Sequence, residues 1–270
     1  MSLVTTKWLK DNFDKVKIID CSWHMPQTKR DGFIEYKKQH IQNSIFFDLD
    51  KNSKQNTNLP HMLTDINSWE NIISDMGIKN DDRVVIYDNS DVISSCRCWY
   101  NFIYFGHNPS LIYVLDGGLK KWIKEDKATT NDLTKIIKSN YQAKERGELV
   151  KNKLEIDKNI SKNEFDVIDA RSKERFEGKS PEPRKGLRSG SIENSFCLPF
   201  SDLINIDRTF IAKDKILEKF RSTKCDLNKN LIFSCGSGVT ASVLALAYSL
   251  IDNKYMPTIY DGSWSEYGKL

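Results

Sequence analysis

The stretch Leu231-Ile232-Phe233-Ser234-Cys235-Gly236-Ser237-Gly238-Val239-Thr240-Ala241 indicates how this chain folds. An apolar run ends at Cys235, a short loop turns the chain, and a second apolar run covers 241–251. This pattern predicts a buried strand, a tight loop and a buried helix.

The loop after the strand has the composition of an anion site. Gly236 and Gly238 permit positive φ, so successive backbone N–H groups can point at one place. The helix that follows adds the positive end of its dipole. A thiolate at Cys235 would be stabilised there and kept reactive. The alternative is a cysteine that only packs at the end of a core strand, but the glycines favour a nucleophile.

The bulk composition excludes several classes of protein. With 270 residues and 39% hydrophobic residues, the chain can form one large domain or two ordinary ones. A formal net charge of +4 suits small anionic ligands, and no lysine or arginine block is long enough to predict nucleic-acid binding. We find neither a targeting segment nor a membrane span, so we expect no membrane partner and a cytoplasmic location.

The cysteines do not have the spacing of metal ligands. The six show no C-x-x-C pair and no suitable spacing with the four histidines. Cys96 and Cys98 fall in a predicted helix, where residues two apart face different ways. We therefore expect free thiols in a reducing compartment, no metal and no cofactor.

The chain repeats one pattern of strands and helices. Predicted strands in the first half cover 16–20, 44–47, 83–87 and 112–115, and those in the second half cover 165–169, 196–199, 231–234 and 258–260. Helical segments alternate with them, which predicts an α/β protein with a parallel sheet flanked by helices in each half. The predicted domains are 1–126 and 159–270, joined by a polar linker at 127–158 with at most short strands such as 141–143.

The two halves differ where chemistry is expected. Aligning the third strands places Asp88 where the second half has Cys235. The loop at 89–92 contains no glycine, and Asp88 and Asp91 would repel an anion. We therefore interpret the first domain as a non-catalytic copy.

The segment from Cys235 to Thr240 resembles the active loop of the tandem rhodanese-domain sulfurtransferases. Among them it is most similar to the 3-mercaptopyruvate sulfurtransferases, whose loop reads C-G-S-G-V-T. The resemblance covers nearly the whole chain and includes the motifs at 116–118, 180–184 and 261–264. It implies two tandem rhodanese-like domains, of which the second is catalytic.

The resemblance also implies a reaction. Cys235 would attack the sulfur of mercaptopyruvate, release pyruvate and keep the sulfur as a persulfide, which a thiol or cyanide then removes. Backbone N–H groups of Gly236, Gly238, Val239 and Thr240 would bind the sulfur anion. The implied partners are a small anionic sulfur donor and a thiol acceptor, for which a thioredoxin-like protein is one candidate. We expect a monomer.

Further site residues follow from the same resemblance. Arg175 and Arg184 have the spacing of the two arginines that hold the substrate's carboxylate and carbonyl in the family. Asp50, His61 and Ser237 match a relay beside the cysteine, which would move a proton to the departing enolate or polarise the mercapto group.

Three other functions fit the sequence less well. A phosphatase of the same fold needs an arginine six positions after the cysteine, where this chain has Ala241. Thiosulfate:cyanide transfer would favour cationic loop side chains, whereas Gly236 and Ser237 are neutral. A non-enzymatic persulfide carrier or binding module would not need both arginines and the relay.

Overall fold

The computed structural model describes residues 2–270; residue 1, where the predicted first domain begins, lies outside the described residues. The chain forms two compact units. The N-terminal unit contains the chain up to Gln55 together with Leu63–Arg146 and Asn205–Phe210, and the C-terminal unit contains Asn56–Met62, Gly147–Ile204 and Ile211–Leu270. Each half of the sequence thus supplies one short segment to the other unit.

The N-terminal unit is built on a five-stranded sheet whose strands are all parallel. Its strands, in spatial order, are β1 (Leu3–Val4), β6 (Ile112–Leu115), β5 (Val84–Tyr87), β2 (Lys17–Asp20) and β4 (Ser44–Phe46). Its helices are α1 (Thr6–Asp11), α2 (Gly32–Lys38), α3 (Ile66–Asp75), α4 (Ser95–Tyr104) and α5 (Gly118–Lys124), with short 3-10 turns η1 (Phe13–Lys15) and η2 (Pro26–Thr28). A small antiparallel pair joins β3 (His40–Ile41) to β7 (Thr129–Thr130).

Both faces of this sheet are covered. On one face, Leu9 of α1 and Trp122 of α5 belong to one cluster with Ile18 and Val85 of the central strands. The central strands are therefore buried on both sides, as continuous apolar runs require.

The C-terminal unit repeats the same parallel sheet. In spatial order its strands are β8 (Val150–Lys151), β12 (Thr258–Tyr260), β11 (Asn230–Ser234), β9 (Phe165–Asp169) and β10 (Phe196–Cys197). Its helices are α6 (Lys153–Lys162), α7 (Lys173–Phe176), α8 (Lys213–Ser222), α9 (Val239–Ser249) and α10 (Ser263–Tyr267), with 3-10 turns η3 (Gly147–Leu149) and η4 (Phe200–Leu203). Each strand has a counterpart at the same place in the first sheet.

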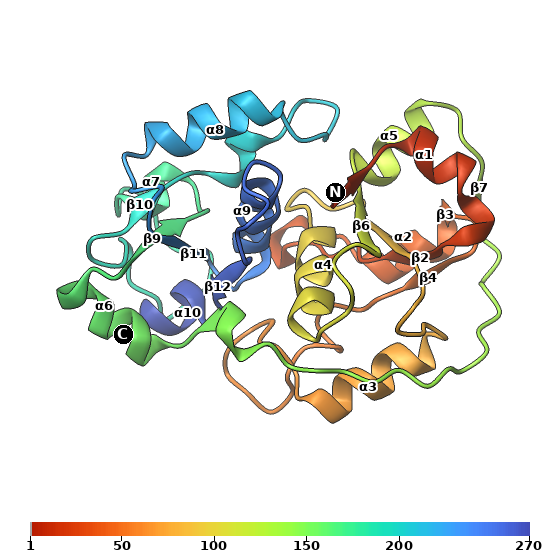
Figure 1. Cartoon of the computed structure of the whole chain (residues 1–270), viewed down its shortest axis with the longest axis horizontal. Helices are drawn as coiled ribbons and strands as arrows, with labels where there is room; N and C mark the ends of the chain where they lie inside the picture. Colours follow the sequence, from red (N-terminus) through yellow and green to blue (C-terminus); the bar gives the residue numbers. More distant parts are fainter. Residues whose placement is uncertain (1) are drawn as a thin grey trace. The chain divides into compact units, whose positions relative to one another are not determined.

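The central strand β11 explains why the stretch around Cys235 organises this unit. Phe233 points to the face covered by α8 and α9, where it meets Phe220 and Tyr248. Ile232 points to the opposite face and packs with Ile156 of α6 and Trp264 of α10. Figure 1 shows these two helix pairs on opposite sides of the sheet. The carboxyl ends of the parallel strands meet at one edge, which is where such sheets place their sites.

The predicted linker at 127–158 contains different structure from what the sequence suggested. The segment 141–143 is not a strand; Tyr141 is instead buried in the N-terminal unit, where its ring stacks on His107. The end of the linker belongs to the C-terminal unit, because β8 forms the edge of its sheet and α6 begins at Lys153. Asn152 and Glu155 cap that helix reciprocally, which fixes its start.

Within residues 2–270, the helices are all too short or too polar to cross a lipid bilayer.

Candidate active site

Cys235 directly follows β11 and is buried, with 2% of its surface exposed. Its backbone N–H donates to Oγ of Ser263 (3.2 Å), and its carbonyl oxygen accepts from the backbone N–H of Trp264 (2.9 Å). The segment after β12 therefore fixes the backbone of the cysteine. Ser263 has a φ of +47°, which is uncommon for a residue with a side chain.

The loop after Cys235 leads directly into α9. Gly238 has a φ of +79°, a conformation that glycine adopts without strain, and the helix begins at Val239. Within residues 2–270, the backbone N–H groups of 236–240 donate to no other group. Unpaired N–H groups at a helix start attract anions. The sequence assigns these donors to Gly236, Gly238, Val239 and Thr240, and that assignment stays a prediction.

Ser237 lies between a histidine and an arginine. Its Oγ is 2.8 Å from Nδ1 of His61 and 3.3 Å from Nη2 of Arg184. A guanidinium can only donate, so the serine oxygen accepts from Arg184 and its own proton is available to His61. Ser237 and His61 are both buried. His61 reaches this place because the segment Asn56–Met62 belongs to the C-terminal unit.

Arg175 and Arg184 meet over Gly236. A Cβ atom placed on this glycine would lie 3.3 Å from Nη1 of Arg184 and 3.6 Å from Nη2 of Arg175. Arg175 lies in α7 and Arg184 in the loop that follows. Both guanidinium groups therefore reach the residue next to Cys235, where they can bind a small carboxylate in parallel.

A buried ionic cluster behind these arginines was not predicted from the sequence. Glu182 accepts from Arg171 Nη1 (2.8 Å) and from Arg175 Nη2 (2.6 Å), and its side chain is 1% exposed. Asp169, at the end of β9, accepts from Nε and Nη2 of Arg171, whose guanidinium lies 4.4 Å from the ring centre of Trp264. The motif 180–184 contained the signal, but the burial of its acid depends on residues distant in sequence.

Asp50, the third member of the predicted relay, lies in the N-terminal unit. Its carboxylate accepts from the indole N–H of Trp23 at 2.9 Å, a contact that the sequence did not suggest. The part of Asp50 in a relay with His61 and Ser237 stays a prediction.

The matching place in the N-terminal unit holds a carboxylate. Asp88 follows β5 as Cys235 follows β11, and it accepts from the backbone N–H groups of Ser90 (2.8 Å) and Ser95 (2.9 Å). Burial raises the pKa of Asp88. The donors that follow this strand are thus taken by the chain's own side chain, and no thiol is present at its end.

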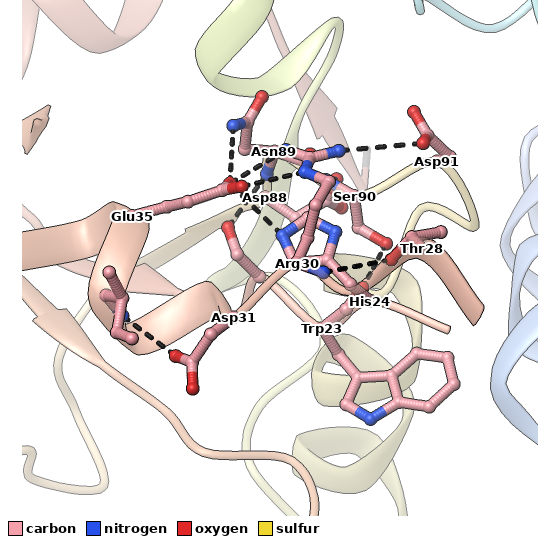
Figure 2. A network of polar contacts seen from close by, with 12 residues as sticks. Trp23, His24, Thr28, Arg30, Asp31, Glu35, Asp88, Asn89, Ser90 and Asp91 are labelled. Carbon is pink, nitrogen blue, oxygen red and sulfur yellow. Dashed lines mark hydrogen bonds and ion pairs between the residues drawn. The ribbon is translucent and has the colours of Figure 1, made fainter. Parts of the chain in front are cut away.

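A polar network holds the loop that follows β5, residues 89–92, in place. The Arg30 guanidinium forms two bonds of 2.7 Å with Glu35, lowering the pKa of this carboxyl, and also donates to the carbonyl of Asn89 (3.2 Å). The Asn89 side chain donates to Glu35 in turn (3.0 Å). Figure 2 shows these residues together with Asp88 and its neighbours.

Four other thiols lie in surroundings that disfavour the thiolate. All six cysteines are free, and burial raises the pKa of Cys197 to about 12. Burial also raises the pKa of Cys21, Cys96 and Cys225. These four thiols stay protonated at neutral pH. Within residues 2–270, no cluster of three or more histidine, cysteine or acidic side chains could hold a metal ion.

The family model of the rhodanese-like domain matches residues 5–125 and again residues 152–270. This chain therefore belongs to the rhodanese-like domain family and carries two copies of the domain.

Similar proteins with this arrangement are named sulfurtransferases. The thiosulfate/3-mercaptopyruvate sulfurtransferase 1, mitochondrial, of Arabidopsis thaliana is 36% identical over 288 residues, covering 98% of this chain and 75% of the relative. The 3-mercaptopyruvate sulfurtransferase of Homo sapiens is 32% identical over 274 residues, covering 98% of this chain and 91% of the relative. The crystal structure of SseA from Escherichia coli, a 3-mercaptopyruvate sulfurtransferase, superposes with a TM-score of 0.88 at 28% identity, covering 98% of this chain and all of the other.

Proposed function

We propose that this chain is a sulfurtransferase that moves sulfane sulfur from 3-mercaptopyruvate to a thiol or cyanide through a persulfide on Cys235. The observation that carries the proposal is the approach of Arg175 and Arg184 to Gly236, the residue next to the cysteine. A 2-oxo acid with a terminal thiol is small and anionic, and its carboxylate suits two guanidinium groups.

The reaction has two halves. The thiolate of Cys235 attacks the sulfur of mercaptopyruvate, an S–S bond forms, and the C–S bond breaks with its electron pair passing to the carbon of the enolate. The proton of the mercapto group is returned to that carbon, so the products are pyruvate and a persulfide anion. The backbone N–H groups after Cys235 stabilise this anion. An acceptor thiolate or cyanide then attacks the outer sulfur and restores the cysteine.

Ser237 and His61 carry the proton of the mercapto group to the enolate carbon. Their contact supports this role, since a serine held by a histidine can pass a proton to a nearby carbanion. We propose that Asp50 orients the histidine and keeps it able to accept the proton.

The neutral loop favours mercaptopyruvate over thiosulfate. Thiosulfate is a dianion, and Gly236 and Ser237 offer it no charge. Arg175 and Arg184 would still admit it weakly, and several relatives are named thiosulfate sulfurtransferases. Low activity with thiosulfate is therefore expected.

Steady-state turnover tests the proposal. Pyruvate release from 3-mercaptopyruvate and thiocyanate formation from thiosulfate are measured with cyanide as acceptor, for the wild type, Cys235→Ser and Cys197→Ser. We expect a large preference for mercaptopyruvate that is lost in Cys235→Ser and kept in Cys197→Ser. A preference for thiosulfate would make the chain a thiosulfate sulfurtransferase, and no turnover of either would favour a persulfide carrier.

For the second half-reaction we propose a thiol acceptor, and a thioredoxin-like protein is the candidate to test in place of cyanide. We also propose a monomer in the cytoplasm. The six free cysteines support a reducing compartment. Because one relative is named as mitochondrial, subcellular fractionation is the test of location, and light scattering is the test of the monomer.

A further inference from the structure

Glu182 is a buried carboxylate whose hydrogen-bond partners are Arg171 and Arg175. It lies between two arginines and uses both oxygens: Oε1 accepts from Arg171 Nη1 (2.8 Å) and Arg175 Nε (3.1 Å), and Oε2 accepts from Arg175 Nη2 (2.6 Å). Arg175 is thus held along one edge of its guanidinium. Within residues 2–270, its Nη1 group has no hydrogen-bond partner.

The arginine behind Glu182 is rigid. Arg171 is 2% exposed, and it donates to both oxygens of Asp169 and to the carbonyl of Gly190 (2.8 Å). Its guanidinium lies 4.4 Å from the ring centre of Trp264. The position of Glu182 is therefore defined by the end of β9 and by α10, which are core elements of the C-terminal unit.

By its charge alone, Glu182 would disfavour an anionic substrate. A buried carboxylate near the two substrate arginines lowers the positive potential there, so it should weaken the binding of an anion. The direct contact between Glu182 and Arg175 favours substrate binding if the orientation of the guanidinium affects binding more than the local potential does.

We propose that Glu182 is a positioning residue for the sulfur-transfer reaction. By holding the Nε–Nη2 edge of Arg175, it fixes the position of Nη2, which is also the Arg175 atom that approaches Gly236, so that the N–H groups not bonded to Glu182 receive the carboxylate of the substrate there. This inference rests on the proposed function and deepens it.

The test is the kinetics of Glu182→Gln with 3-mercaptopyruvate at saturating acceptor. Glutamine keeps the size of the side chain but presents an amide N–H₂ to two donors. We expect KM to rise about tenfold or more, since bonds between charged groups are replaced. If potential alone mattered, the loss of a negative charge would lower KM, and an unchanged or lower KM overturns the proposal.

Glu177→Gln is the matched control. It removes the same charge from a nearby exposed glutamate, whose partners are Lys179 (2.7 Å) and Lys173 (3.8 Å). We expect its KM to stay within about twofold of the wild type, as surface pairs contribute little.

A double-variant cycle shows whether Glu182 acts through Arg175. Adding Glu182→Gln to Arg175→Ala should change kcat/KM far less than adding it to the wild type does, whereas independent, multiplying effects would overturn the proposal.

Thermal unfolding shows whether each variant is folded. If Glu182→Gln does not fold, Glu182→Asp replaces it: the carboxylate with shorter reach should also raise KM, and a wild-type KM contradicts the inference. An inactive wild type rejects the proposed function, while an active wild type with unaltered Glu182 variants rejects this inference alone.

Discussion

Nδ1 of His61 lies 2.8 Å from Oγ of Ser237, although the two residues are 176 positions apart in the sequence. The pair forms because Asn56–Met62, from the first half of the chain, belongs to the C-terminal unit. The reverse occurs at Asn205–Phe210, which belongs to the N-terminal unit and whose Arg208 donates to the carbonyl of Ser90. Ser237 and Ser90 each lie three positions after the last residue of the equivalent strand, which is Ser234 in β11 and Tyr87 in β5. The two repeats thus exchange equivalent segments, and only one exchange brings a histidine beside a cysteine loop.

The contact between His61 and Ser237 should matter for proton transfer. We expect His61→Ala and Ser237→Ala each to lower kcat for pyruvate release about 100-fold, because general acid–base groups contribute on this scale. The double variant should be little worse than either single one, since the two residues act as a unit. Stopped-flow or steady-state pyruvate assays measure this. Multiplying losses would show that the residues act separately.

The segment after β12 should hold the cysteine loop in its active form. Ser265 donates from its Oγ (2.6 Å) and from its backbone N–H (2.9 Å) to the carbonyl of Gly236. Ser265→Ala should lower the free energy of unfolding by about 1 kcal/mol and also raise KM.

Ser249→Ala is the control for this effect. Ser249 makes a similar bond to the carbonyl of Leu246 (2.6 Å), at the far end of α9. Comparable loss of stability with wild-type kinetics is the expected result for Ser249→Ala. Equal kinetic effects in both variants would show that Ser265 has no special role at the loop.

A buried carboxyl in the N-terminal unit should make stability depend on pH. Burial raises the pKa of Asp20 from 3.8 to about 7. Between these values the folded chain holds a proton that the unfolded chain has lost, so stability falls as pH rises from about 4 to 7 and is then constant. The slope can reach about 1.4 kcal/mol per pH unit.

Asp20→Asn removes this ionisation but keeps an oxygen that can accept from the backbone N–H of Ser22, as Asp20 does at 2.9 Å. We expect the variant to be more stable than the wild type at pH 8 and closer to it at pH 4. Thermal unfolding across this range is the measurement. A variant that is destabilised equally at every pH would contradict the assignment.

The sequence predicted those parts of the molecule that depend on local pattern. The apolar run to Cys235, the glycines after it and the apolar helix beyond are adjacent in the chain, so their structure could be inferred from periodicity. The capping box at Asn152 and Glu155 is also a local pattern, but we did not predict it. Used as a helix start signal, it places the start of α6 inside the predicted linker.

Other features depend on contacts between distant residues. Glu182 lies between two prolines in a polar loop, which suggests an exposed acid, and its burial follows only once Arg171 is fixed by Asp169 and Trp264. Tyr141 has the neighbours of a strand, yet it packs on His107 instead of pairing. No spacing within the sequence contains this information.

A single-turnover experiment tests the central claim most directly. The enzyme is mixed with a stoichiometric amount of 3-mercaptopyruvate without an acceptor, and pyruvate and the mass of each cysteine-containing peptide are measured. The account predicts about one pyruvate per chain and the addition of one sulfur atom to the peptide that contains Cys235, with neither in Cys235→Ser. Pyruvate release without sulfur on this peptide, or sulfur carried by another cysteine, would contradict it.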